Sequence, residues 1–510
     1  MLLVDITSRG AGLFGSRTAV RTSDGAQTYR QLHAGVCGLI DLLATAGGVG
    51  RGTRLAILAP NGIVFLQAVF AASWLGAVVV PLNTRLSPDD IRFQLDDAEV
   101  RHGLIDPALS ELARASGLLE RTHWPTGDAL VDALAGRSAS VEELIASGVV
   151  RSALPTDPVV QLYTSGTTGR PKGCLLTQAG WLAANANVAH RFSLVDSDVL
   201  LGVYPLFHVA GLGLAMAHLM VGGSVVFPDG ADPEALWSAI ERHSVTVAGL
   251  PGLPAALERP GAGTAGRSLR ILFGGANMES AHTLRRVGEV LPGAEFLGIY
   301  GSTEGGNVVS VSTLAEERER PGTIGRALLG FDVAILDSDD RLLGPGQEGV
   351  LCLRGLSVMA GYAGRERDTA EALRSGWLHT GDIMRLDADG YLYFVDRDKD
   401  MIKPGGENVY SIEVERVLLQ HPAVADVAVL GVPDSRWGEA VKALVVLAPD
   451  AEATLEDLDA HCLAGLAPFK RPRWYEFTDA IPRSVTGKIV KRDLRAAHDP
   501  ARSVRLRERA

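Results

Sequence analysis

Cysteine is scarce in this chain, and its spacing excludes two common uses of the residue. The four cysteines, Cys37, Cys174, Cys352 and Cys462, stand more than a hundred residues apart and form no C-x-x-C pair. This spacing predicts neither a zinc site nor a disulfide framework. The first residues also lack a basic region followed by an apolar core, so a secretory signal is not expected. We therefore expect a reducing, cytoplasmic location.

Excess positive charge is absent as well. The 510 residues include 49 Lys and Arg against 60 Asp and Glu, which gives a formal charge of −11. The basic cluster at residues 502–509 lies at the end of the chain. Because neutralising phosphate requires concentrated Lys and Arg, this balance excludes a nucleic-acid binder.

Uninterrupted apolar segments of membrane-spanning length are also lacking. Two uncharged stretches, residues 63–82 and 199–227, are long enough to cross a bilayer, but each is broken internally. In the first, Asn61 is placed to cap a helix that Gly76 ends, and a buried strand follows. In the second, Pro205 and three glycines separate a strand, a loop, a helix and another strand. We predict no transmembrane segment.

The apolar pattern predicts an α/β fold with more than one domain. Short β-rich runs alternate with helix-length segments, which indicates α/β layers, and a chain of this length exceeds one ordinary core. After residue 323 the pattern changes to hairpins, one with Asp389 and Gly390 in its turn. We predict a large N-terminal domain of layered α/β subdomains over residues 1–396, whose β-rich subdomain covers 323–396, and a small α/β domain over residues 397–510.

Two local features mark the start of the small domain. The charged run at residues 396–400 predicts an exposed linker. Ser411 is predicted to cap the next helix, and Thr454 with Asp457 predicts a capping box further on.

The strongest chemical signal is the segment 163–173, which follows a short β-run. It packs four Ser or Thr hydroxyls, three glycines and a lysine into eleven positions. Glycines let backbone N–H groups converge on an anion, and Lys172 adds positive charge. The order differs from a Walker A motif, because Pro171 stands where that motif needs glycine. The segment predicts a phosphate site, with a flexible polar loop as the alternative.

This segment resembles the phosphate-binding motif of the adenylate-forming superfamily of acyl-CoA synthetases, nonribosomal adenylation domains and firefly luciferase. Further motifs resemble those of the superfamily and follow in the same order along residues 25 to 495. They lie at residues 204–211, 274–276, 300–304, 380–382, 396–397 and 486–488. The resemblance implies a mobile small domain that pivots near Lys399.

The resemblance also implies roles toward ATP. Thr303 contacts phosphate, Glu304 holds Mg²⁺, Asp382 and Arg397 bind the ribose, and Lys488 bridges the attacking carboxylate and the α-phosphate. Taken alone, each would more often be a cap, loop or surface residue. The nucleotide set implied by resemblance is Thr164, Ser165, Gly166, Thr167, Thr168, Gly169, Lys172, Ala276, Tyr300, Gly301, Ser302, Asp382, Arg397 and Lys488.

The acyl pocket is implied by resemblance too. His208 gates that pocket by packing and does not act as the base, although a satisfied core histidine is the alternative. We group His208 with Thr303, Glu304 and Lys488 as the candidate catalytic residues. Residues 206–216 contain no Arg or Lys, which favours an apolar aliphatic or aryl acid over a dicarboxylate. The implied acyl-binding set is His208, Gly211, Gly274, Ala276, Gly298 and Asn307.

The acceptor of the acyl group is predicted to be CoA. Residues 404–410 resemble the glycine loop that lines the pantetheine tunnel of CoA ligases, with Gly405, Gly406 and Glu407 at its centre. Arg85 and Lys470 match positions that meet CoA phosphates in some relatives.

We thus predict an ATP- and Mg²⁺-dependent carboxylic acid:CoA ligase that releases AMP and pyrophosphate. One alternative passes the acyl group to a carrier-protein thiol or a nitrogen nucleophile. A second is a non-catalytic nucleotide-binding regulator, which the intact motif residues disfavour. Homodimerisation is left open.

Overall fold

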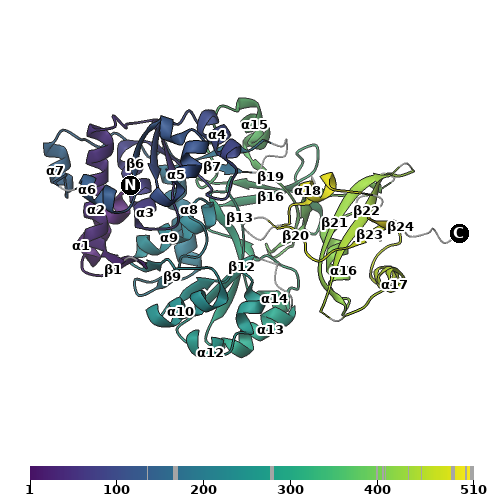
Figure 1. Cartoon of the computed structure of the whole chain (residues 1–510). Helices are drawn as coiled ribbons and strands as arrows, with labels where there is room; N and C mark the ends of the chain where they lie inside the picture. The colour runs from purple at the N-terminus through teal and green to yellow at the C-terminus, as the bar shows by residue number, and fades with distance from the viewer. Residues whose placement is uncertain are drawn as a thin grey trace. The chain divides into compact units, whose positions relative to one another are not determined.

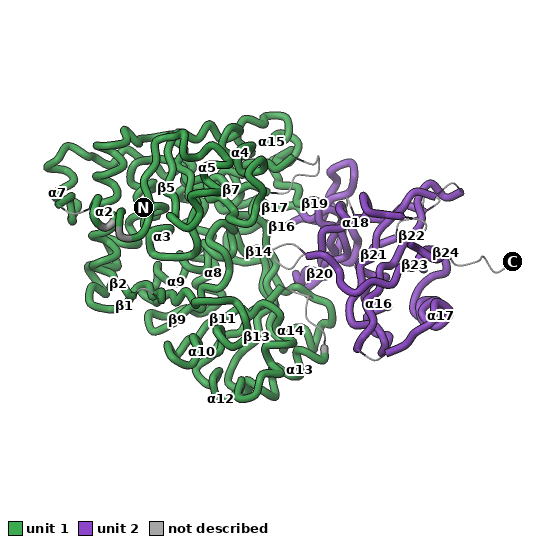
Figure 2. Tube along the Cα trace, in the orientation of Figure 1, with its two compact units in different colours: residues 1–333, 352–380 green, residues 334–351, 381–510 purple. Residues whose placement is uncertain are grey.

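The computed structural model describes residues 1–505 apart from 24, 135, 165–169, 276–280, 398–399, 405–406, 408, 435, 450, 484–488 and 500–501. The described part forms four sheets with helices between and around their strands (Figure 1). Two compact units can be separated, Met1–Val333 with Cys352–Thr380 and Ala334–Leu351 with Gly381–Ala510 (Figure 2). The multi-domain α/β class is confirmed. The boundary after residue 396 and the pivot at Lys399, which lies outside the described residues, stay predictions.

The first unit contains a seven-stranded sheet with a parallel centre. Its order is β18-β8-β7-β4-β3-β5-β6, and only β8 and β18 run antiparallel to their neighbours. The strands are β3 Arg54–Leu58, β4 Val78–Pro81, β5 His102–Ile105, β6 Thr122–Pro125, β7 Pro158–Thr164, β8 Lys172–Thr177 and β18 Gly361–Tyr362.

The same unit contains a nine-stranded sheet built on the same plan. Its order is β15-β14-β13-β12-β11-β9-β10-β1-β2, with a parallel centre and antiparallel strands at both ends. The strands are β1 Thr18–Thr22, β2 Gly25–Thr28, β9 Val199–Leu201, β10 Ser224–Val226, β11 Val247–Gly249, β12 Ile271–Gly275, β13 Glu295–Ser302, β14 Asn307–Thr313 and β15 Arg326–Ala327.

Helices fill the connections between these strands. They are α1 Asp5–Phe14, α2 Tyr29–Thr45, α3 Ile63–Leu75, α4 Pro88–Asp97, α5 Ser110–Ala115, α6 Asp128–Leu134, α7 Val141–Ala146, α8 Gln178–Arg191, α9 Val209–Val221, α10 Pro233–His243, α11 Leu253–Leu257, α12 Ala262–Ala265, α13 Ala281–Val290, α14 Leu314–Glu319 and α15 Glu366–Ala372.

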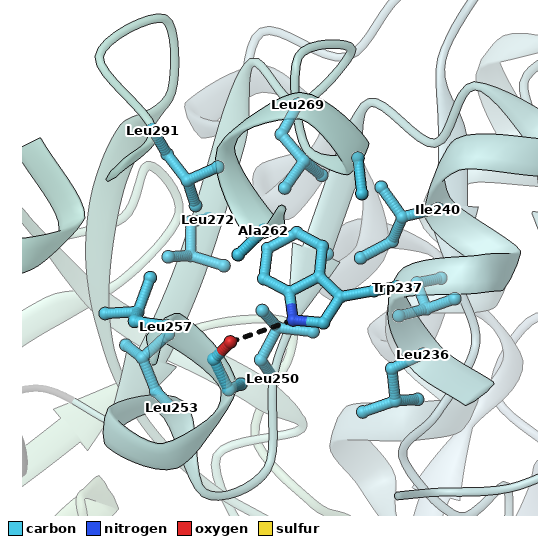
Figure 3. Packing of buried hydrophobic residues seen from close by; sticks show 14 of the residues in the cluster. Leu236, Trp237, Ile240, Leu250, Leu253, Leu257, Ala262, Leu269, Leu272 and Leu291 are labelled. Carbon is cyan, nitrogen blue, oxygen red and sulfur yellow. Dashed lines mark hydrogen bonds between the residues drawn. The ribbon is translucent and has the colours of Figure 1, made fainter. Parts of the chain in front are cut away.

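A cluster around Trp237 shows how helices pack on the nine-stranded sheet. The indole of Trp237 is fully buried and donates Nε1–H to the Ala256 carbonyl oxygen at 2.9 Å, so its polar atom is satisfied (Figure 3). Leu272 of β12 and Ile240 of α10 belong to the same cluster. The cluster includes Leu272 of β12, the strand that leads into the predicted motif at residues 274–276.

The two long uncharged stretches divide as predicted. The first gives α3 and β4, and Gly76 ends the helix with a φ of +70°. The second gives β9, α9 and β10. Among the described residues, no helix has the length and hydropathy needed to cross a bilayer.

The predicted cap of α3 was wrong. The helix begins after Gly62 with no side-chain cap. Asn61 instead donates from Nδ2 to the carbonyl oxygens of Gly202 and Tyr204 at 3.1 and 2.9 Å, and its Oδ1 accepts from the Leu206 N–H at 2.8 Å. Asn61 therefore fixes the loop before α9, because these bonds satisfy its side chain better than a local cap.

Among the described residues, the second unit holds most of one four-stranded sheet, all of a second four-stranded sheet, and three helices. Their orders are β16-β17-β19-β20 and β21-β22-β23-β24, and the predicted turn at Asp389 and Gly390 joins β19 to β20. The elements are β16 Asp332–Leu336, β17 Glu348–Arg354, β19 Leu378–Leu386, β20 Leu392–Arg397, α16 Ser411–Leu418, β21 Val424–Asp434, β22 Gly438–Leu447, α17 Leu455–Gly465, β23 Trp474–Phe477, α18 Lys491–Ala496 and β24 Val504–Arg505.

Three local predictions in this unit have clear outcomes. The capping box of Thr454 and Asp457 is present at α17. The prediction of an exposed linker at residues 396–400 was wrong at both ends, because Asp396 is 1% exposed and Asp400 is 9% exposed. The cap by Ser411 was also wrong, since Tyr410 precedes α16 and the Ser411 hydroxyl donates to Asp396.

Candidate active site

Two hairpin turns carry the predicted phosphate and magnesium residues. In the seven-stranded sheet, β7 and β8 pair antiparallel with Thr164 opposite Lys172, so these two residues flank the segment 165–171. In the nine-stranded sheet, β13 and β14 pair with Ser302 opposite Asn307, and the turn between them contains Thr303 and Glu304. Thr164 and Ser302 stand at the carboxyl ends of β7 and β13, which belong to the parallel parts of their sheets, and open α/β sheets bind ligands at such ends.

The two hairpins meet at the Glu304 carboxylate. Thr164 donates from Oγ1 to Glu304 Oε1 at 3.2 Å, and the Tyr362 hydroxyl donates to the same oxygen at 3.0 Å. The Glu304 carbonyl oxygen accepts from the Met359 N–H at 2.9 Å. Burial, followed by the nearby Glu304 charge, raises the pKa of Tyr362, so its hydroxyl stays a donor.

Lys172 lies beside Tyr362. Its Nζ is 2.6 Å from Asp368 Oδ1 and 5.2 Å from the centre of the Tyr362 ring. Asp368 belongs to α15, and Tyr362 belongs to β18, which pairs with β8. The ammonium group therefore has a carboxylate and an aromatic face as neighbours in the first unit.

Two glycines make the β13–β14 hairpin possible. Gly306 has a φ of +89°, and a Cβ there would meet the Ser357 carbonyl oxygen at 2.2 Å. A Cβ on Gly301 would meet the Asn307 carbonyl oxygen at 2.1 Å. Side chains at either position would push the turn open, so these glycines fix where Glu304 stands.

Predicted acyl residues gather near the same strands. Gly274 of β12 is paired with Gly298 of β13. Asn307, 2% exposed at the start of β14, donates from Nδ2 to Asn185 Oδ1 of α8 at 3.2 Å. Gly213 of α9 leaves space for this pair, because a Cβ there would lie 2.2 Å from Asn307 Nδ2.

His208 and Gly211 lie at the start of α9. His208 directly precedes the helix, is half-buried, and has its ring 4.8 Å from the ring of Phe207. A Cβ on Gly211 would meet the Pro205 carbonyl oxygen at 2.3 Å, so this glycine permits close packing of the loop against the helix. These contacts fit the packing role predicted for His208.

The predicted ribose residues form a pair in the second unit. Asp382 of β19 is directly opposite Arg397 of β20, and Arg397 Nε lies 3.4 Å from Asp382 Oδ1. The side chain of Asp382 is 11% exposed and that of Arg397 36%. The guanidinium thus stays partly open to solvent beside a carboxylate suited to accept hydroxyl groups.

The predicted CoA residues are not brought together by any described contact. Arg85 is exposed, and its backbone N–H bonds to Asn83 Oδ1 at 3.0 Å. Lys470 Nζ lies 2.8 Å from both carboxylate oxygens of Glu413. The Glu407 N–H donates to the Pro404 carbonyl oxygen at 3.2 Å.

Several predicted site residues lie outside the described residues and stay predictions. They are Ser165, Gly166, Thr167, Thr168, Gly169, Ala276, Lys399, Gly405, Gly406 and Lys488. Lys488 belongs to the segment 484–488, and the two residues that flank this segment, Arg483 and Ile489, form a β-bridge with each other.

Three neighbours of the predicted residues were not predicted from the sequence: Tyr362, Asp368 and Asn185. Each is an ordinary residue in its local sequence, and Lys172 and Asp368 are 196 positions apart. The Gly361–Tyr362 strand is only two residues long, so no periodic pattern announces its pairing with β8.

Comparisons with known proteins agree with this arrangement. The AMP-binding enzyme family matches residues 8–363, and the AMP-binding enzyme C-terminal domain matches residues 413–488. A feruloyl-CoA synthase of Amycolatopsis sp is 38% identical over 495 residues, covering 94% of this chain and 95% of that protein. A 2-succinylbenzoate–CoA ligase of Bacillus mycoides is 34% identical over 482 residues, with the same coverage.

Solved structures give the same result. ATP-bound MatB from Rhodopseudomonas palustris superposes with a TM-score of 0.87 at 28% identity, covering 97% of this chain and 99% of that one. The anthranilate CoA ligase AuaEII with anthranoyl-AMP gives 0.87 at 27% identity, covering 98% of both chains. The chain belongs to the AMP-binding enzyme family, and the predicted adenylate-forming superfamily is confirmed.

Proposed function

We propose that this chain uses ATP to activate an aromatic or other apolar carboxylic acid as its acyl-adenylate and then transfers the acyl group to CoA. Its curated relatives are CoA ligases of the AMP-binding family, which confirms the predicted class of AMP-forming acid–thiol ligase. The observation that carries the proposal is the hydrogen bond from Thr164 to Glu304, which joins the turns of two sheets at the predicted phosphate site.

In the first half-reaction, a carboxylate oxygen of the acid attacks the α-phosphorus of ATP. A P–O bond to the acid forms, the bond to pyrophosphate breaks, and the products are acyl-AMP and pyrophosphate. We propose that Thr164 and Lys172, which flank the predicted phosphate segment, hold phosphate oxygens. By resemblance Lys488 stabilises the charge that develops as pyrophosphate leaves.

Mg²⁺ fits the chemistry of the Glu304 turn. Among the described residues there is no cluster of three or more His, Cys, Asp or Glu side chains able to hold a metal. Mg²⁺ commonly uses one or two carboxylates plus substrate phosphates, so the single carboxylate of Glu304 suffices. Bound there, the ion would neutralise phosphate charge, while Thr164 and Tyr362 keep the carboxylate oriented through Oε1.

The acid is proposed to be aromatic. The names of two similar proteins specify feruloyl and anthranilate groups, each a benzene ring that carries a single carboxylate as the free acid. The first turns of α9 contain no Lys or Arg that would favour a second carboxylate, and the aromatic rings of Phe207 and His208 directly precede this helix. The buried amide of Asn307 adds one polar group to the implied acyl set.

CoA is proposed as the acceptor because the two curated relatives are CoA ligases. Its thiolate attacks the carbonyl carbon of acyl-AMP, and AMP leaves. The roles of Arg85, Glu407 and Lys470 toward CoA remain part of this proposal. Homodimerisation and a cytoplasmic location also stay predictions.

The acceptor can be tested by mass analysis of reactions that contain ATP, Mg²⁺ and an aromatic acid, with and without CoA. The proposal expects acyl-AMP without CoA and acyl-CoA with it. If both reactions yield only acyl-AMP, and a further reaction transfers the acyl group to a carrier protein or an amine, CoA is not the acceptor.

The role of Lys488 is tested by measuring the two half-reactions separately. Lys488→Ala should impair adenylation far more than thioester formation from supplied acyl-adenylate, because CoA attack does not need charge stabilisation on pyrophosphate. Equal losses in both half-reactions would remove Lys488 from the adenylation step.

A further inference from the structure

A buried polar chain in the second unit runs from the predicted ribose pair to α18. It links Asp382, Arg397 and Asp396 to Ser411, Lys491 and Glu415, all of them within residues 381–510. Ser411 is fully buried, and Asp396 and Lys491 are 1% and 9% exposed. Buried charge and hydroxyl groups in such a chain need specific partners, because unpaired ones are costly.

The chain begins on β20, where Asp396 and Arg397 are neighbours. Successive side chains of a strand point to opposite faces, so Arg397 meets Asp382 on β19 while Asp396 meets α16. The Asp396 carboxylate also accepts the Arg397 backbone N–H at 2.7 Å. Fixing Asp396 therefore fixes the peptide from which the Arg397 side chain projects.

Ser411 is the centre of the chain. Its hydroxyl donates to the two Asp396 oxygens at 3.0 and 2.8 Å, and its backbone N–H also donates to Asp396. The same hydroxyl accepts from Lys491 Nζ at 2.6 Å. Ser411 thus ties β20 to α18 with both its donor and its acceptor capacity in use.

Lys491 closes the chain at the start of α18. Its Nζ lies 2.7 Å from Glu415 Oε1, an oxygen that also accepts the Val429 N–H at 2.9 Å. Burial raises the pKa of both Glu415 and Asp396, and the Lys491 charge opposes that rise in each case. One buried ammonium group therefore supports two buried carboxylates.

We infer that Asp396, Ser411 and Lys491 are positioning residues that hold Arg397 and Asp382 in the geometry that binds the ribose of ATP. The inference rests on the proposed function, which gives that pair the ribose role. The ribose contacts are assigned to Asp382 and Arg397, and none of these three residues is proposed to touch the nucleotide. They act through the orientation of Arg397, whose guanidinium lies beside the Asp382 carboxylate.

The test compares ATP with 2′-deoxy-ATP in acid-dependent pyrophosphate exchange by the full chain. The readout is kcat/KM for ATP divided by kcat/KM for 2′-deoxy-ATP. A purely structural role would not change this ratio. Ser411→Ala and Lys491→Met should each lower the wild-type ratio about tenfold, the value of one hydrogen bond to a charged group. Lys491→Arg should restore most of the ratio.

Lys442 offers a matched control. It is a second buried lysine of the same unit, 1% exposed, and its Nζ lies 2.6 Å from Glu476 Oε2 and 3.0 Å from His498 Nδ1, neither of which belongs to the polar chain. Lys442→Met should lower the melting temperature and leave the nucleotide ratio unchanged. If Lys491→Met does not fold, Ser411→Ala, which removes only one hydroxyl, still tests the inference.

Asp382→Ala separates this inference from the proposed function. A lower ratio in Asp382→Ala, Ser411→Ala and Lys491→Met, with Lys442→Met unaffected, supports both. A lower ratio in Asp382→Ala alone overturns the positioning role and leaves the ribose assignment standing. An unchanged ratio in Asp382→Ala contradicts the ribose assignment, and an equal fall in Lys442→Met contradicts the positioning role.

Discussion

Thr164 and Glu304 come from different sheets, yet the Thr164 hydroxyl donates to the Glu304 carboxylate at 3.2 Å. The Tyr362 hydroxyl donates to the same oxygen at 3.0 Å. One carboxylate oxygen thus orders the ends of β7, β13 and β18 around the predicted phosphate site.

This shared oxygen predicts coupling between Thr164→Val and Tyr362→Phe. Each substitution removes one donor to Oε1, and the double variant leaves that oxygen with neither. We expect the double variant to lose more activity than the sum of the single losses in free energy, by about 1 kcal/mol. A double-mutant cycle on kcat/KM for ATP measures the coupling, and strictly additive losses would show that the two hydroxyls act independently.

Glu304→Gln should remove the proposed magnesium ligand while keeping the shape of the turn. The amide oxygen can still accept from Thr164 and Tyr362, but the negative charge is gone. We expect pyrophosphate exchange to fall about 100-fold, as for the loss of a preorganised electrostatic contact, with a higher Mg²⁺ requirement. The measurement is exchange rate against Mg²⁺ concentration; an unchanged curve would exclude Glu304 as the ligand.

Gly213→Ala tests the acyl pocket. The new methyl group would approach Asn307 Nδ2 at 2.2 Å, so the Asn307 amide must move away from its present position. We expect KM for the preferred acid to rise about tenfold, with KM for ATP unchanged. Gly12→Ala is the control, since nothing lies within 4 Å of a Cβ there in α1. Equal KM changes for acid and ATP would place Asn307 outside the acyl pocket.

His218 predicts a pH dependence of stability. Burial lowers its pKa from 6.5 to about 4, with the Leu214 carbonyl oxygen 2.8 Å from Nδ1 and the charges of Asp198 and Arg270 acting in opposite directions. The folded state keeps the ring neutral, whereas the unfolded chain protonates it below pH 6.5. The free energy of unfolding should therefore fall by about 3 kcal/mol between pH 6.5 and 4.

His218→Leu should remove this part of the pH dependence, and denaturant unfolding at several pH values measures it. His123→Gln, at an exposed position, should retain the wild-type slope. Parallel pH profiles for His218→Leu and the wild type would show that His218 does not contribute this acid sensitivity.

Much of the fold could be predicted because local patterns agree with it. Gly76 ends α3, and Thr454 caps α17, since both signals act within one turn of the chain. The turn of Glu304 could be placed as well, but Tyr362 and Asp368 could not, because long-range strand pairing brings them in. The charged residues around Asp396 predicted an exposed linker, yet Asp396 is buried. This burial could not be predicted, because its partner Ser411 and the lysine that bonds Ser411, Lys491, come from distant positions in the sequence.

The most direct test of the account is pyrophosphate exchange into ATP by the full chain, measured across a panel of carboxylic acids. We predict exchange that depends on Mg²⁺ and on the acid, with aromatic monocarboxylates such as ferulate and anthranilate more active than dicarboxylates such as 2-succinylbenzoate. Exchange with none of these acids would contradict acyl-adenylate formation, and exchange confined to dicarboxylates would contradict the proposed apolar, aromatic pocket.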